Sequence, residues 1–163
     1  MNNEYLSTLV INKLKANKQS IAVAESCTGG LLSKYLTDVS GASSVFFYGA
    51  VTYNEDIKQK ILGVKKETLE KFSVYSRAVA FEMADGVRKK AGTYYGVGIT
   101  GVAGPGSDGE IPAGTIYICI VTPNKTLYID LSNKFDNDIR NSNREAAVGA
   151  TLEAILKELE NGE

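Results

Sequence analysis

The stretch that decides the fold is residues 21–32, which read IAVAESCTGGLL. Its first four residues are apolar and suit a short buried strand, and the leucines after the glycines resume a helical spacing that continues to Tyr35 and Leu36. Residues 25–30 therefore form a turn that leads from a strand into a helix. Ligands of α/β proteins gather at such strand ends, so this turn is a candidate functional site.

The rest of the chain alternates between helical and extended patterns. Apolar residues three or four positions apart predict helices over residues 6–14, 31–36, 79–87 and 148–159. Runs of apolar, β-branched and aromatic residues predict strands over residues 21–24, 43–53, 94–100, 115–121 and 126–131. The last two strands are separated by only four residues, which favours an antiparallel hairpin and makes the sheet mixed. We therefore expect a three-layer α/β/α fold with a mixed β-sheet, in one domain over residues 1–163.

Two further helix starts carry residues of the capping type. Ser76 is the expected N-cap of one, and Asn54 begins an acidic segment that opens a short helix carrying Lys58. Tyr53 and Lys58 therefore bracket a strand end and a helix start.

The composition narrows the class of protein. The 18 basic and 19 acidic side chains nearly cancel, and neither sign forms a block that would neutralise the phosphates of a nucleic acid. Residues 1–5 lack the basic start of a signal peptide, and no apolar run approaches the roughly 20 residues of a membrane span. Cys27 and Cys119 are too few for a disulfide framework. We expect a soluble cytoplasmic protein whose partners include neither nucleic acid nor a membrane.

The sequence contains no histidine, which is the commonest general base and the commonest metal ligand in proteins. This absence excludes Ser-His-Asp triads, Cys-His dyads and histidine-ligated zinc sites. The P-loop pattern and the G-x-G-x-x-G dinucleotide pattern are also missing. Acid–base chemistry must therefore come from lysine, tyrosine or carboxylate side chains.

The turn at Ser26 has two interpretations. A serine just before a helix start can expose its oxygen while backbone N–H groups of the turn point at a developing oxyanion, and Gly29 and Gly30 allow close approach of a substrate. In the other interpretation Ser26 or Thr28 caps the helix, and the glycines only permit a tight turn. The turn alone does not decide between a nucleophile and a cap.

Without histidine, a serine can be activated by a neutral lysine or by a tyrosinate, and the candidates are Lys58 and Tyr53. A free lysine has a pKa near 10.4, so the site must lower it by roughly 2–3 units to give a useful base. The alternative for Lys58 is a solvated side chain near a helix start. Cys27 is either a rival nucleophile or a small buried residue.

Two further segments offer groups for ligand binding. Thr100, Gly101 and Gly104 begin a loop rich in glycine and proline, whose backbone amides line an anion or form part of an ordinary flexible loop. Arg140 and Arg144 lie one helical turn apart, so both can meet one phosphate or carboxylate. The alternative for the two arginines is an exposed position without a ligand.

Several motifs occur in an order typical of a known protein family. They comprise residues 24–30, residues 49–53 with Lys58 and residues 62–64, and residues 99–105 with residues 112–115. In these motifs the chain resembles the CinA C-terminal domain family over nearly its whole length. Standalone members of that family include nicotinamide-mononucleotide deamidases of the PncC type.

The resemblance implies hydrolysis of the carboxamide of nicotinamide mononucleotide to nicotinate mononucleotide and ammonia, without a metal or another cofactor. The family's serine maps onto Ser26, its tyrosine onto Tyr53 and its lysine onto Lys58. Our hypothesis is that neutral Lys58, assisted by Tyr53, deprotonates Ser26, whose oxygen attacks the carboxamide carbon to give an acyl-enzyme. Backbone N–H groups near Ser26 and near Gly101 are expected to stabilise the oxyanion.

The resemblance also implies partners and leaves one alternative. Arg140 or Arg144 is expected to hold the phosphate of the nucleotide substrate, and relatives suggest a homodimer or a larger homo-oligomer. The alternative is a non-catalytic module that binds pyridine nucleotides or takes part in competence or DNA damage, because family members are also found fused to another domain. The chain departs from the family pattern at Asn54, Arg77 and Ile111, which concerns substrate specificity more than catalysis.

Overall fold

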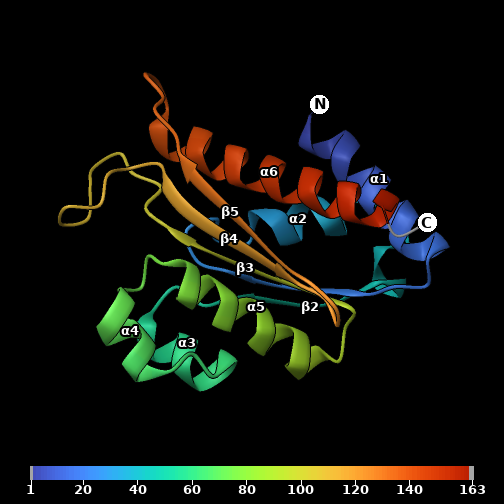
Figure 1. The fold of residues 1–163 in the computed structure, drawn as a ribbon. Coiled ribbons are helices and arrows are strands. Elements are labelled where there is room, and N and C mark those ends of the chain that lie inside the picture. Colours follow the sequence, from blue (N-terminus) through green and yellow to red (C-terminus); the bar gives the residue numbers. More distant parts are fainter. Residues whose placement is uncertain (1, 162–163) are drawn as a thin grey trace.

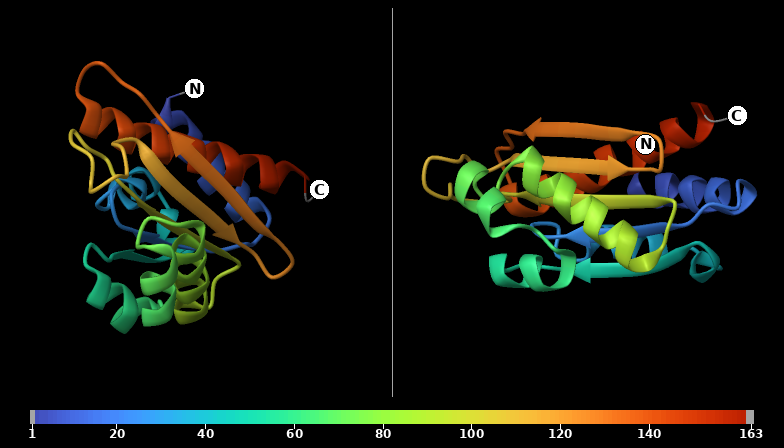
Figure 2. Two further views of the ribbon diagram at one scale, coloured as in Figure 1. Left: turned by 60° about the vertical axis from the view of Figure 1, so that its left-hand side comes forward. Right: turned by 60° about the horizontal axis from the view of Figure 1, so that its bottom comes forward.

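A five-stranded sheet runs between two layers of helices in the structure, a computed structural model that describes residues 2–161 (Figure 1, Figure 2). One face of the sheet is covered by α1 (Asn3–Ala16), α2 (Leu31–Thr37) and α6 (Ile139–Asn161). The other face carries α3 (Glu55–Leu62), α4 (Lys66–Phe72) and α5 (Arg77–Ala91). The predicted three-layer α/β/α fold is confirmed.

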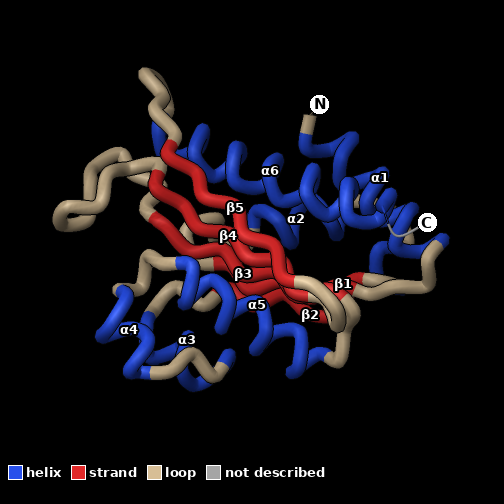
Figure 3. Tube along the Cα trace, viewed as in Figure 1, coloured by secondary structure: helices blue, strands red, loops and turns tan. Residues whose placement is uncertain are grey.

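The sheet has the strand order β2-β1-β3-β4-β5 and is mixed, as predicted (Figure 3). Its strands are β1 (Ile21–Glu25), β2 (Phe46–Val51), β3 (Tyr95–Gly101), β4 (Thr115–Val121) and β5 (Thr126–Ser132). β1 is parallel to both of its neighbours, β2 and β3, whereas β4 is antiparallel to β3 and to β5. The chain therefore leaves β1 toward β2 on one side and returns past β1 to β3 on the other. In open α/β sheets such a reversal places a crevice at the carboxyl ends of the strands.

Helix α5 lies directly against β3, and two glycines of the strand make this contact possible. A Cβ atom added at Gly96 would lie 2.3 Å from the carbonyl oxygen of Ala84, and one added at Gly98 would lie 2.2 Å from that of Ala80. Both distances are far below van der Waals contact. The backbones of α5 and β3 therefore touch, and only glycine fits at these two strand positions.

Two local features differ from the sequence prediction. The strand predicted over residues 43–53 begins as a 3-10 helix, η1 (Ala42–Ser44), and β2 itself shifts register against β1 between the partners of Ile21 and Ala22. Helix α4 was not predicted, because it buries a single apolar residue, Leu69, and so shows no helical periodicity. β2 also ends at Val51 rather than at Tyr53, so that Tyr53 lies in the turn between β2 and α3.

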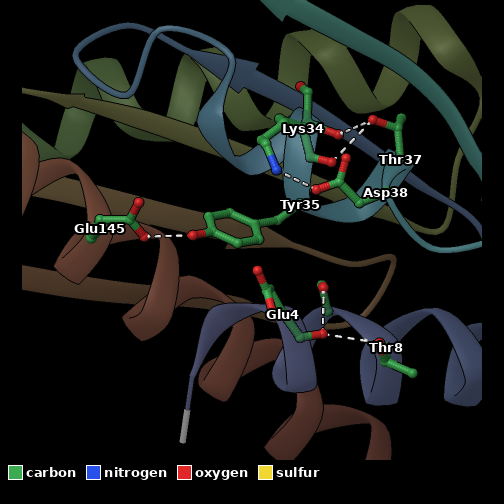
Figure 4. Close-up of polar contacts among 9 residues, drawn as sticks. Glu4, Thr8, Lys34, Tyr35, Thr37, Asp38 and Glu145 are labelled. Carbon is green, nitrogen blue, oxygen red and sulfur yellow. Dashed lines mark hydrogen bonds and ion pairs between the residues drawn. The ribbon is translucent and has the colours of Figure 1, made fainter.

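Three helices on one face are joined by a single carboxylate, that of Glu145 on α6. Its Oε2 atom accepts hydrogen bonds from the Tyr35 hydroxyl on α2 at 2.9 Å and from Asn3 Nδ2 on α1 at 2.8 Å. Figure 4 shows the Tyr35 ring reaching across to Glu145. This contact fixes α6 relative to α2.

None of the helices within residues 2–161 is long and apolar enough to cross a membrane.

Candidate active site

A pocket of about 320 Å³ lies where the carboxyl ends of the three parallel strands meet. Ser26 follows β1, the segment from Thr52 to Lys58 follows β2, and a loop follows β3 and extends beyond the sheet (Figure 1). The pocket volume lies at the lower end of the range typical of small-molecule sites, roughly 300–1,000 Å³. The pocket is lined by Ser26, Cys27, Tyr53, Tyr75, Arg140 and loop residues 101–108.

The turn after β1 is held by a buried carboxylate. Glu25 is fully buried, and its Oε1 atom accepts a hydrogen bond from the Leu32 N–H at 2.8 Å. Its Oε2 atom accepts from the N–H of Ser33 at 3.0 Å and from the hydroxyl of Ser33 at 2.7 Å. Gly30, at the N-cap position of α2, has no side chain to cap the helix. Glu25 therefore satisfies the free N–H groups of α2 from seven residues upstream.

Of the two interpretations of the turn, the one in which Ser26 or Thr28 caps α2 is wrong. The Ser26 hydroxyl is directed to Lys58 instead, with Lys58 Nζ donating to Ser26 Oγ at 2.9 Å. Thr28 Oγ1 is buried and has no hydrogen-bond partner within residues 2–161. Because Glu25 does the capping, the serine hydroxyl is available for another role.

Lys58 is 1% exposed, so its charged form is poorly solvated. Besides Ser26, its Nζ donates to the carbonyl oxygen of Thr52 at 2.7 Å. Burial lowers the pKa of Lys58 to about 8, and Cys27 and Glu55 oppose that change only in part. With this pKa, roughly a tenth of the lysine is neutral at pH 7. Lys58 is therefore not a solvated side chain, and its neutral amine can accept the proton of a serine.

The start of α3 positions Lys58. The side chain of Asn54 caps the helix, since its Oδ1 atom accepts from the N–H of Asp56 at 2.8 Å and of Ile57 at 3.3 Å. The predicted capping role of Asn54 is confirmed, and so is that of Ser76, which accepts from the Val79 N–H at 3.2 Å on α5. Lys58 follows within the first turn of α3 and points inward.

Cys27 is a buried thiol rather than a thiolate. Burial raises the pKa of Cys27 to about 12, although its own backbone and Lys58 act in the opposite direction. A thiol with this pKa is protonated at neutral pH and is a poor nucleophile. Cys119 lies in the core against α5, and burial raises its pKa to about 12 as well. The rival nucleophile therefore lacks support.

Tyr53 lines the pocket, but its hydroxyl is bonded to Arg140 and not to the serine–lysine pair. Arg140 Nη2 donates to the Tyr53 hydroxyl at 2.7 Å, and Arg140 Nη1 donates to the Gly104 carbonyl oxygen at 2.7 Å. No hydrogen bond within the described residues joins Tyr53 to Ser26 or Lys58. Lys58 reaches Ser26 directly, so the expected path through Tyr53 is not formed.

The two arginines do not share a ligand site. Arg140 lines the pocket, whereas Arg144, one turn further along α6, donates through Nε and Nη2 to the carbonyl oxygen of Thr28, at 3.2 and 2.8 Å. Arg144 thereby holds the turn after β1 against α6. The possibility that both arginines meet one phosphate is not supported, because Arg144 is bonded to the neighbouring turn.

Several residues expected to bind substrate have structural contacts instead. Thr28, Gly29 and Gly30 form the turn and do not line the pocket; both glycines have positive φ angles. Thr100 is fully buried, and its hydroxyl donates to the carbonyl oxygen of Val74 at 2.9 Å. Of the residues predicted in the loop after β3, Gly101 and Gly104 line the pocket.

Sequence reasoning missed one pair in the pocket wall. The hydroxyl of Tyr75, just before α5, donates to the Asp108 carboxylate in the loop after β3. Burial and this hydrogen bond raise the pKa of Tyr75 to about 12. The two residues are 33 positions apart, and neither belongs to a recognisable motif. No local sequence signal links them.

The backbone of the turn after β1 already has contacts within the protein. The Ser26 N–H donates to the carbonyl oxygen of Ile99 at 3.0 Å and is not available to a substrate. The backbone of the next residue, Cys27, contacts its own thiol and in part lowers the pKa of that thiol. Residues 2–161 contain no three His, Cys, Asp or Glu side chains grouped so that they could hold a metal ion. The site therefore presents a serine hydroxyl next to a lysine amine.

Fold and pocket together define an α/β domain with a buried serine–lysine pair at the carboxyl ends of its parallel strands. Residues 3–159 match the CinA C-terminal domain, and the chain belongs to that family. The predicted family resemblance is thereby confirmed.

Individual relatives agree with this assignment. The chain is 43% identical over 155 residues to a CinA-like protein of Kosmotoga olearia, a match that covers 94% of this chain and 38% of the relative. It is similar to a crystal structure of competence/damage inducible protein CihA from Agrobacterium tumefaciens, with 34% identity, a TM-score of 0.90 and coverage of 98% of this chain and 96% of that one. It is also similar to competence damage-inducible protein A (ComA) from Klebsiella pneumoniae, with 29% identity, a TM-score of 0.93 and full coverage of both chains. The chain spans less than two fifths of the length of the curated relatives it matches.

Proposed function

We propose that the chain is a cytoplasmic amidohydrolase that converts nicotinamide mononucleotide and water to nicotinate mononucleotide and ammonia, with Ser26 as nucleophile and Lys58 as base. The observation that carries this proposal is the 2.9 Å contact between Oγ of Ser26, a residue of the pocket lining, and Nζ of the buried Lys58. A serine next to a neutral lysine is the known alternative to a serine–histidine pair. The choice of substrate rests on the family resemblance.

In the first half of the reaction, neutral Lys58 takes the proton of Ser26 as Oγ forms a bond to the carboxamide carbon. The negative charge on the carboxamide oxygen is stabilised by backbone donors, for which the N–H of Cys27, a residue of the pocket lining, is our candidate. Protonated Lys58 then gives its proton to the amide nitrogen. The C–N bond breaks, ammonia leaves, and an ester joins Ser26 to the nicotinate carbon.

In the second half, water attacks the ester carbon while Lys58 again accepts a proton. The bond between Oγ and the carbon breaks, and Lys58 returns the proton to Ser26. Nicotinate mononucleotide leaves the pocket. Each proton that Lys58 receives is passed on within the cycle, so the reaction needs only water as co-reactant.

Arg140 is the candidate for the phosphate of the substrate. It is the positively charged side chain in the pocket lining, and Tyr53 and Gly104 fix its guanidinium in place. A fixed guanidinium binds a phosphate bidentately and loses little rotamer freedom on binding. In this proposal Tyr53 positions Arg140. The homodimer or larger assembly expected from relatives stays a prediction.

The test is the release of ammonia from nicotinamide mononucleotide by the purified full chain. We expect turnover by the wild type and a loss of at least about 10³-fold in Ser26→Ala, since removing a nucleophile leaves only binding and oxyanion stabilisation. Ser40→Ala, the same change at an exposed serine outside the pocket lining, serves as the matched control. Full activity in Ser26→Ala would overturn the assigned nucleophile. Nucleotide binding without turnover by the wild type would favour the non-catalytic module.

A further inference from the structure

The pocket contains two fixed charges of opposite sign, and each is held by the hydroxyl of a tyrosine. Arg140 is bonded to Tyr53, and Asp108 is bonded to Tyr75. Arg140 and Asp108 are the charged side chains among the described residues that line the pocket. The pocket wall thus has a positive and a negative pole.

The two poles come from opposite helix layers. Arg140 lies on α6, which covers one face of the sheet, and Tyr75 lies two residues before α5, which covers the other (Figure 2). The loop after β3 connects them, because Gly104 accepts from Arg140 and Asp108 accepts from Tyr75. Four residues of chain span at most about 14 Å, so the two anchor points of the loop lie within reach of one small molecule.

The Tyr75–Asp108 side of this arrangement is built into the fold. Tyr75 follows Val74, whose carbonyl oxygen is held by the buried hydroxyl of Thr100 at the end of β3. Ser76 caps α5 directly after it. A tyrosine fixed on both sides holds the carboxylate of an otherwise exposed loop at the pocket. A carboxylate that only served solubility would need no such support.

We propose that Asp108, held by Tyr75, recognises the positively charged ring of a pyridinium nucleotide, while Arg140 faces the phosphate of the same molecule. This inference rests on the proposed function and refines it: the pocket selects a zwitterion. Nicotinamide bonded through its ring nitrogen to ribose is a cation, and the phosphate at the other end is an anion. A carboxylate near the ring attracts the positively charged ring of the substrate. Because the bound ligand displaces water from the pocket, this attraction is screened less than it would be in bulk solvent.

The same charge also favours release of the product. Hydrolysis replaces the neutral carboxamide by a carboxylate, so the product carries one more negative charge on the ring. Asp108 repels that charge, whereas it attracts the substrate ring. The pocket therefore binds nicotinate mononucleotide more weakly than nicotinamide mononucleotide.

The test measures binding by calorimetry to the full chain carrying Ser26→Ala, so that no ligand is consumed. Three probes separate the charges: nicotinamide mononucleotide, its 1,4-dihydro form with an uncharged ring and the same phosphate, and nicotinamide riboside with the charged ring and no phosphate. Adding Asp108→Asn should lower the affinity for nicotinamide mononucleotide and for nicotinamide riboside by roughly three- to tenfold, a size expected for one partly screened charge. The affinity for the dihydro form should not change. Adding Arg140→Gln should lower the affinity for the two probes that carry a phosphate and leave the affinity for nicotinamide riboside unchanged.

Two further variants keep the result interpretable. Glu110→Gln removes a charge from the same loop outside the pocket lining and should change none of the three affinities. Tyr75→Phe keeps the carboxylate but releases it, and should reproduce part of the Asp108→Asn effect on the charged rings alone.

The inference would be overturned if Asp108→Asn lowered the affinity for charged and uncharged rings equally. Asp108 would then only hold the loop in place. In that case wild-type turnover of nicotinamide mononucleotide would still support the proposed function. Failure of every pyridine probe to bind, together with no turnover by the wild type, would overturn both.

Discussion

Two helix starts border the pocket, and they are capped in different ways. Asn54, at the start of α3, caps the helix with its own side chain. At the start of α2 the hydroxyls of Ser26 and Thr28 do not cap, and the buried carboxylate of Glu25 does so from within the preceding strand. The turn after β2 follows the ordinary rule for its residue types, whereas the turn after β1 breaks it.

The difference teaches how a serine in a turn becomes available for chemistry. A hydroxyl that accepts a bond from the helix backbone is committed to structure. Glu25 takes over that task, so Ser26 can face Lys58 at 2.9 Å. The two turns therefore have different roles. The turn after β1 carries the serine nucleophile, and the turn after β2 begins the helix that carries the lysine base.

The largest expected effect comes from removing the partner of Ser26. Lys58→Met should lower kcat/KM for nicotinamide mononucleotide by at least about 10³-fold, because the serine loses its general base. In the wild type the rate should rise about tenfold per pH unit below pH 8 and level off above it, since only the neutral lysine accepts a proton and its pKa is about 8. Rates measured from pH 6 to 9.5 check this. A rise that persists in Lys58→Met would show that another group is the base.

The next effect breaks the unusual cap. Glu25→Ala should lower the free energy of unfolding by about 3 kcal/mol, because it leaves the N–H groups of Leu32 and Ser33 unpaired in a buried site. Glu25→Gln should lose less, since its amide oxygen still accepts one bond. Urea denaturation measures both, with the exposed Asp56→Ala as control. A loss below about 0.5 kcal/mol in Glu25→Ala, as for an ordinary surface change, would remove Glu25 from its capping role.

A third prediction concerns how burial of Lys58 makes the free energy of unfolding depend on pH. The pKa of Lys58 is lower in the folded state, about 8, than the roughly 10.4 of an unfolded chain, so the unfolded chain binds more protons between these values. The stability of the wild type relative to Lys58→Met should therefore rise with pH, by roughly 2 kcal/mol from pH 7 to pH 9.5. Parallel denaturation curves of the two proteins at both pH values check the sign. A difference that does not change with pH would mean that Lys58 keeps its ordinary pKa in the fold.

The smallest effect is the sharpest comparison of the two turns. Asn54→Ala should cost about 1 kcal/mol of stability as the loss of an N-cap, while Thr28→Val should cost less than about 0.5 kcal/mol because the Thr28 hydroxyl caps nothing and has no partner within residues 2–161. Activity should follow the same order, with a larger loss in Asn54→Ala because Asn54 caps the helix that positions Lys58. Melting curves and ammonia release on the same preparations give both readings. A larger stability loss in Thr28→Val than in Asn54→Ala would contradict the difference between the two turns.

The features that local patterns encode were predictable from the sequence. The hairpin of β4 and β5 followed from a four-residue break between two strand-like runs, and the caps Asn54 and Ser76 followed from residue type and position. The cap by Glu25 was not predictable, because ordinary capping patterns span about three residues and this one spans seven. Local spacing carries no information about such contacts.

The same reason accounts for the errors in the candidate site. Tyr53 and Arg140 are 87 positions apart, and Arg144 meets Thr28 over 116 positions. These pairs depend on how α6 lies across the turn after β1, which periodicity within one helix does not specify. The absence of histidine left lysine and tyrosine as possible bases, and the resemblance to the family then assigned Ser26 and Lys58 to the pair. The other contacts of the site depend on how the helix layers pack against the sheet.

The glycine contact between α5 and β3 has a consequence for the range of sequences that can support this site. Gly96 and Gly98 do not line the pocket, yet any side chain there would drive the helix off the strand that ends at Gly101. Tyr75 and Ser76, at the entrance of α5, would move with it. In a random library screened for activity, these two buried positions should therefore accept as few replacements as Ser26 itself, although they carry no chemical group at all.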